Sequence, residues 1–180
     1  MAKIDINKYQ IKYTDQFFFD TNVWLLIFGT IANFQKPDQT AYSKFLQNLI
    51  SKDKPIFITS MVLSEFANVL LRHDFKQWQT SNQLVNQSFK KDFIGTTDYN
   101  NSVTAIKRIV NNILNIPNIN KVSDSFHVSD IENILKDFGT VDYNDSYLYH
   151  LAKINNYKIV TNDNDFHFFS KNIDIITNQI

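Results

Sequence analysis

Short apolar runs alternate along this chain with longer segments in which apolar residues recur every three or four positions. The runs at residues 17–19, 56–59, 158–161 and 173–177 predict β-strands. Apolar residues mostly alternate over residues 4–14, which predicts an extra edge strand or an extended arm. Strands separated by helices favour an α/β fold with a parallel sheet and helices on both faces.

The helical spacing predicts helices over about 38–51, 60–72, 74–91 and 102–116. Another helix pattern begins directly after the first strand, at Thr21. Ser129 and Glu132 have the spacing of a capping box, which predicts a helix that Gly139 closes. A last helix is expected from Asp142 to about Asn155.

Composition narrows the class of protein and the kind of metal site. A chain of 180 residues with 43% hydrophobic and 20% charged residues is typical of a single globular domain, here 1–180. The sequence has no long apolar run and no signal-peptide pattern, so we expect a cytoplasmic protein without a membrane segment. Because it has no cysteine, any metal must be held by oxygen or histidine ligands, which favours Mg²⁺ or Mn²⁺.

Acidic residues stand at or after the ends of three of the expected strands. Asp20 ends the first strand, Glu65 lies on the helix after the second, and Asp163 and Asp165 follow the strand at 158–161. The carboxyl ends of parallel strands form the edge at which ligands bind in open α/β sheets. This placement predicts one shared acidic pocket. Asp145 is a further candidate, near the start of the helix expected after Asp142.

All of these acids except Asp145 also have a structural explanation. Asp20 and Asp142 stand where helix N-caps are expected, and Glu65 has the default position of a solvated helix residue. Asp163 and Asp165 lie in a turn rich in Asn and Asp, where such residues occur for conformational reasons. Several carboxylates in one pocket would repel each other unless cations or protons neutralise them, which favours a metal site.

The order of these motifs resembles the PIN domain family. The resemblance rests on Asp20-Thr21-Asn22 after a strand, Ser60 and Glu65 on the next helix, Asp145-Ser146-Tyr147-Leu148, and Thr161 to Phe166. It implies a three-layer sandwich with a central parallel sheet flanked by helices. It also implies Mg²⁺- or Mn²⁺-dependent cleavage of RNA to products with a 5′-phosphate and a 3′-hydroxyl. Many small bacterial members are VapC-like toxins, so an antitoxin partner and a homodimer are further expectations.

Carried over to this sequence, the resemblance implies a set of site residues. The metal-binding and catalytic acids would be Asp20, Glu65, Asp145 and Asp163, with Asp142 and Asp165 as further candidate ligands. The polar residues expected to support them are Thr21, Asn22 and Thr161.

Two departures from the family pattern concern packing and substrate choice. The residues after Ser146 are bulkier than the usual aliphatic and alanine run. The stretch from 73 to 128 is longer than in the smallest toxins, so residues 74–116 are interpreted as a helical insertion. We expect this insertion to stand off the sheet as a hairpin that covers the pocket or receives a partner.

Other functions fit parts of the sequence. A phosphatase with an Asp-x-Asp motif would use Asp20 as its nucleophile, but Asn22 stands where its general acid is needed. A PIN-fold nuclease of RNA processing and a catalytically silent binding module are two further candidate functions. Equal numbers of acidic and basic residues, 18 each, do not by themselves indicate a nucleic-acid binder. The candidates for RNA backbone contacts are Arg72, Lys76, Lys90, Lys91, Lys107 and Arg108, each of which also fits a solvated helix face.

Overall fold

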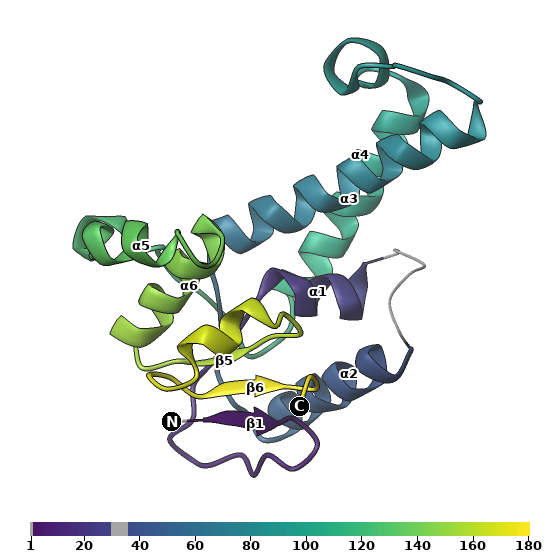
Figure 1. Ribbon diagram of the computed structural model, residues 1–180. Helices are drawn as coiled ribbons and strands as arrows, with labels where there is room; N and C mark the ends of the chain where they lie inside the picture. Colours follow the sequence, from purple (N-terminus) through teal and green to yellow (C-terminus); the bar gives the residue numbers. More distant parts are fainter. Residues whose placement is uncertain (1, 30–35) are drawn as a thin grey trace.

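The central element is a six-stranded parallel sheet with strand order β1-β6-β5-β2-β3-β4. The computed structural model describes residues 2–29 and 36–180. The strands are β1 (Lys3–Asp5), β2 (Phe17–Phe19), β3 (Ile56–Ile58), β4 (Ile119–Lys121), β5 (Lys158–Val160) and β6 (Ile175–Thr177). The predicted parallel α/β sheet is therefore confirmed, and strands from both ends of the chain lie side by side in it (Figure 1).

The four predicted strands are present, with ends shifted by up to two residues. An edge strand is present near the N-terminus but is shorter than the expected element over 4–14. The strand β1 pairs with β6, and residues 6–14 form turns and irregular chain. The strand β4 was not predicted. Its residues pair with β3 at the sheet edge, but their side chains are exposed or half-buried, so they show no apolar pattern.

Both faces of the sheet are covered, because the side chains of β2 point alternately to one face and the other and each packs against other apolar groups. Phe17 and Phe19 pack against Phe45 of α2 (Lys36–Ser51), with ring centroids 5.6 and 6.4 Å apart. Phe18 points to the other face and stacks parallel to Tyr157. All three phenylalanines of β2 are fully buried. This gives the predicted three-layer arrangement of helices around a central sheet.

The remaining helices are α1 (Thr21–Phe28), α3 (Ser60–Ser81), α4 (Thr97–Leu114), α5 (Ile131–Asp137) and α6 (Tyr143–Ile154). Among the described residues, none of the helices has the length and hydrophobicity needed to span a membrane. The capping prediction for α5 was wrong by one residue. Asp130, not Ser129, accepts the hydrogen bond from the Asn133 backbone, while the Ser129 hydroxyl donates to the carbonyl of Ser125.

The helices α3 and α4 form a hairpin that extends well beyond the sheet (Figure 1). The prediction of separate helices over 60–72 and 74–91 was wrong, because α3 continues without a break to Ser81. No glycine or proline occurs within it, so nothing ends the helix near Arg72. A π-helical turn, Phe89–Phe93, then connects to α4, which begins five residues before the predicted 102.

An aromatic cluster holds the tip of this hairpin together. Phe93 is fully buried and lies 5.2–5.7 Å, centroid to centroid, from its aromatic neighbours. These neighbours are Phe75, Trp78, Phe89 and Tyr99. Packing is therefore the observed role of the aromatic residues in this segment, and the tip has a small core separate from that of the sheet.

Candidate active site

The candidate site lies at the carboxyl ends of β5, β2 and β3, which are neighbours in the sheet. Asp20 follows β2 directly, Thr161 follows β5, and Glu65 lies in the second turn of α3, the helix after β3. Because these strands are parallel, their following residues meet at one edge. The placement of the acids predicted from strand order is therefore the placement observed.

Asp20 is a buried carboxyl group, only 3% exposed. It occupies the N-cap position of α1, but its side chain makes no capping hydrogen bond. Its Oδ2 atom instead accepts a hydrogen bond from the Thr161 hydroxyl at 2.9 Å. Burial raises the pKa of Asp20 to about 7, and the charges of Glu65 and Asp163 add to this rise, which the Thr161 hydrogen bond opposes.

Asp145 is a second acid held away from water. It lies in the first turn of α6, 8% exposed. Burial raises the pKa of Asp145 to about 8, and repulsion from Asp20, followed by Asp142, contributes next. Charges on Asp163 and Glu65 act in the same direction. The charges of Glu65 and Asp163 therefore act on both buried acids, Asp20 and Asp145.

The two remaining acids of this set are held by α1. The Thr21 hydroxyl donates to Glu65 Oε2 at 2.9 Å, and the Asn22 amide donates to Asp163 Oδ2 at 3.1 Å. Both carboxylates are half-buried. The first turn of α1 thus orients an acid from α3 and an acid from the loop after β5. Thr21 and Asn22, the residues that the resemblance implied as supports, thus each donate a hydrogen bond to one candidate acid.

Asp142 and Asp165, the two further candidate ligands, form hydrogen bonds that stabilise the local backbone. Asp142 is exposed, and its Oδ1 accepts the backbone N–H of Asp145 at 2.9 Å, so the capping interpretation of Asp142 is confirmed. Asp165 is exposed, and its own N–H donates to Asp163 Oδ1 at 2.9 Å. Asp163 therefore closes the turn that its sequence context predicted, while its second oxygen faces Asn22.

Thr161 links the buried acid to the loop after β5. Its hydroxyl donates to Asp20 and accepts the N–H of Asp163 at 2.9 Å. Its carbonyl accepts a hydrogen bond of 2.6 Å from the hydroxyl of Tyr42, on α2. Sequence reasoning missed Tyr42, which looked like one more apolar position of its helix. A tyrosine among core positions is the signal that it needs a buried acceptor.

The donor set has the chemistry of a hard divalent cation site. It consists of carboxylates supported by hydroxyl and amide groups, and repulsion among the buried acids would be relieved by a cation. Within the described ranges, however, no three Asp, Glu or His side chains are close enough to form a complete metal site. The acids are neighbours, with Glu65 and Asp163 tied to α1 by their hydrogen bonds.

The sequence of this chain matches a protein-family model over most of its length. A family model described as PIN domain matches residues 17–171. The chain belongs to the PIN domain family. This match includes every candidate acid and supporting residue of the PIN domain, but not β1 or β6, which form one side of the sheet. A search of curated proteins finds no significant match.

Two solved structures are similar to this PIN domain. One is VapBC2 from Rickettsia felis bound to a DNA fragment from their promoter. It has a TM-score of 0.51 and 14% identity, and the alignment covers 89% of this chain and 97% of that chain. The other is PAE2754 from Pyrobaculum aerophilum, with a TM-score of 0.47, 12% identity and coverage of 90% and 84%. At 14% identity, the similarity to the VapBC2 structure supports the PIN-like fold alone.

Proposed function

We propose that this PIN domain is an endoribonuclease that depends on Mg²⁺ or Mn²⁺ and hydrolyses RNA phosphodiester bonds. The observation that carries the proposal is the pair of buried carboxyl groups, Asp20 and Asp145, whose pKa values are raised to about 7 and about 8. Burying two mutually repelling acids is costly. A bound divalent cation would neutralise these carboxylates, and membership of the PIN domain family supports this explanation.

Each residue has a defined role in this proposal. Asp20, Glu65, Asp145 and Asp163 would hold the cation, which would supply Lewis-acid activation of water and charge neutralisation at the phosphate. The Thr161 hydroxyl fixes the carboxylate of Asp20, and the Thr21 hydroxyl fixes that of Glu65. Burial of Asp20 and Asp145 excludes bulk water from the acids, which strengthens their interaction with positive charge.

The competing functions fit the geometry less well. An Asp-x-Asp phosphatase needs a carboxyl group at position 22 as its general acid. The Asn22 amide donates a hydrogen bond to Asp163, but its N–H protons are not acidic enough for that role. A silent binding module would not need the charge repulsion that surrounds Asp145. A role in RNA processing uses the same chemistry as the proposed nuclease and differs only in its substrate.

Replacing Asp20 with asparagine tests the catalytic part of the proposal. We expect the wild type to cleave RNA with Mg²⁺ or Mn²⁺ but not with EDTA, and Asp20→Asn to lose activity by orders of magnitude. Asn keeps the shape of Asp and can accept the Thr161 hydrogen bond, so the fold should persist. Asp53→Asn is the matched control, because Asp53 is exposed and precedes β3 at the opposite edge of the sheet. A wild type that cleaves no RNA with either metal contradicts the proposal.

We further propose that the protein is the toxin of a type II toxin–antitoxin pair, acts in the cytoplasm and forms a homodimer. The VapC-like order of the motifs supports this role, and the α3–α4 hairpin is the surface proposed to cover the pocket or receive the antitoxin. Regulated expression should arrest growth with the wild type but not with Asp20→Asn. Co-expression of a small neighbouring gene product should restore growth. Light scattering that shows only monomers at high concentration would contradict the homodimer.

A further inference from the structure

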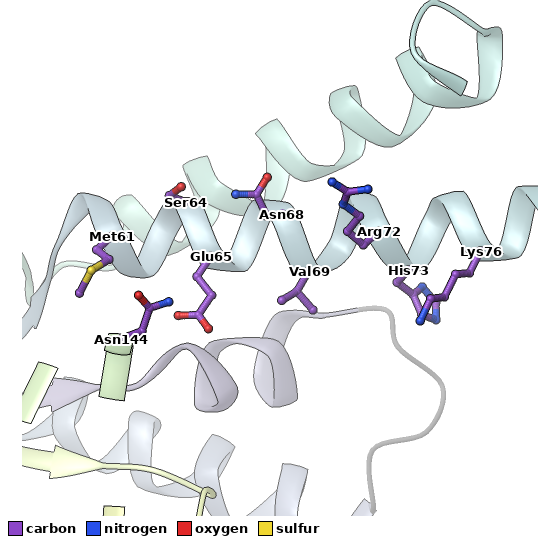
Figure 2. A pocket seen from close by; sticks show the side chains of 9 residues that line it. All are labelled: Met61, Ser64, Glu65, Asn68, Val69, Arg72, His73, Lys76 and Asn144. Carbon is purple, nitrogen blue, oxygen red and sulfur yellow. The ribbon is translucent and has the colours of Figure 1, made fainter. Parts of the chain in front are cut away.

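A groove runs along α3 from the candidate acids toward the hairpin tip. It encloses a cavity of about 620 Å³, within the usual range of ligand pockets. Eight of its lining residues belong to α3 and one, Asn144, to α6 (Figure 2). Glu65 lies near one end of this groove, and the basic residues Arg72 and Lys76 lie toward the other.

The two ends of the groove have opposite charge. In Figure 2 the side chains of Glu65, Val69, His73 and Lys76 point toward α1, whereas the Arg72 side chain points away from α1. Arg72 and Lys76 are exposed, and none of the ion pairs within the described part of the chain involves either of them. Two cations without a carboxylate partner are available to bind an anion.

Arg72 is held in position by the hairpin tip. Its guanidinium carbon lies 4.2 Å from the centroid of the Phe89 ring, a cation–π contact that orients the planar donor group. Phe89 belongs to the π-helical turn and packs against Phe75 and Phe93. The tip therefore does more than close the hairpin, because it restricts the guanidinium at the groove wall.

The helix fixes the spacing between the acids and these cations. At 1.5 Å per residue, Arg72 and Lys76 lie about 10 Å and about 16 Å along the axis from Glu65. A stacked nucleic-acid strand rises roughly 3.4 Å per nucleotide, so these distances correspond to about three and about five nucleotides. Val69 adds apolar surface between the charged ends, against which a base can pack.

We propose that Arg72 and Lys76 form a phosphate-binding subsite for RNA nucleotides about three to five positions from the bond that is cleaved. This inference rests on the proposed nuclease function, which places the cleaved phosphate at the acids. The subsite anchors the strand through its backbone and sets a minimum length for a good substrate on that side. His73 borders the same groove and is already within 3.6 Å of Asp74, so it is not part of the subsite.

Binding of oligouridylates of two, four, six and eight nucleotides, measured by fluorescence anisotropy in EDTA, tests the subsite without cleavage. We expect wild-type affinity to rise steeply between two and six nucleotides. Each backbone contact to a single strand contributes about 0.7 to the slope of log K against log salt concentration. Lys76→Ala should therefore lower that slope by about 0.7, which is about a fivefold loss of affinity at 0.1 M salt.

Arg72→Gln keeps much of the side chain over Phe89 while removing the charge, and should act in the same way. The matched controls are Lys52→Ala and Lys52→Gln, at an exposed lysine between α2 and β3 that does not line the groove. Thermal melts identify any variant that fails to fold. Equal losses in groove and control variants, or none in Lys76→Ala and Arg72→Gln, would overturn the subsite.

The proposed function and the subsite can fail separately. If the wild type cleaves RNA with metal but the groove variants bind and cleave like the controls, the subsite is wrong and the nuclease assignment stands. If no metal supports cleavage but the groove variants still lose binding selectively, the groove binds RNA and the nuclease assignment is wrong.

Discussion

The raised pKa values of the buried acids predict that the metal-free protein loses stability as pH rises. In the unfolded chain Asp20 releases its proton near pH 4, but in the folded protein it keeps the proton up to about pH 7. Between these values the folded state binds more protons than the unfolded state, so the free energy of unfolding falls with increasing pH. Asp145, with a pKa of about 8, acts in the same direction.

The size of the effect follows from the shift at Asp20. One pKa unit corresponds to about 1.4 kcal/mol, so the interval from pH 5 to pH 7 contributes about 3 kcal/mol. For a domain of this size that lowers the melting temperature by on the order of 10 °C. Asp20→Asn removes this titration and also removes one of the charges that raise the pKa of Asp145. The variant should therefore melt higher than the wild type at pH 8.

Thermal melts in EDTA at pH 5 and pH 8 measure this difference for the wild type, Asp20→Asn and the control Asp53→Asn. The other titratable groups are the same in the wild type and in Asp20→Asn, so comparison of the two isolates the contribution of Asp20. Mn²⁺ at pH 8 should raise the melting temperature of the wild type more than that of Asp20→Asn. A wild type that gains stability from pH 5 to pH 8, or a variant with the same pH dependence, would refute the reasoning.

Other contacts lead to further predictions. Thr161→Val removes the hydroxyl that donates to Asp20 and should cost about 1–3 kcal/mol, with weaker metal binding, as measured by urea unfolding and Mn²⁺ titration. Phe93→Ala should cost about 3–5 kcal/mol locally, and hydrogen exchange should show lost protection at the hairpin tip while the sheet stays protected. Asp142→Ala should cost about 1 kcal/mol by removing the cap of α6, whereas Asp142→Asn should melt like the wild type.

The fold was predictable where a segment is buried on both sides. The three phenylalanines of β2 form a run without alternation, as expected for a central parallel strand, and its position fixed the edge at which the acids meet. The strand β4 could not be found in this way. It lies at the sheet edge with Asn120 and Lys121 exposed, and its pairing with β3 depends on tertiary contacts that leave no pattern in the sequence.

The candidate acids could be named from the sequence, but their contacts could not. The order of the motifs identified Thr21 and Asn22 as supporting residues, yet which acid each would hold depends on the angle at which α1 leaves β2. Burial decided the roles of Asp142 and Asp145. Three residues apart at the start of one helix, they differ because α6 turns Asp145 inward and leaves Asp142 to cap its N-terminus.

The position at which α3 ends determines whether Glu65 and the cationic residues Arg72 and Lys76 lie on one surface. A helix that stopped near Arg72 would leave Lys76 on a separate element with no fixed distance to Glu65. Because α3 continues to Ser81, Glu65, Arg72 and Lys76 lie on one rigid cylinder. The 73–81 segment has no helix-breaking residue, and the packing of Phe75 and Trp78 against Phe93 stabilises its last turns. The aromatic residues of the tip therefore keep two cations at a set distance from the acids, which composition and net charge alone do not reveal.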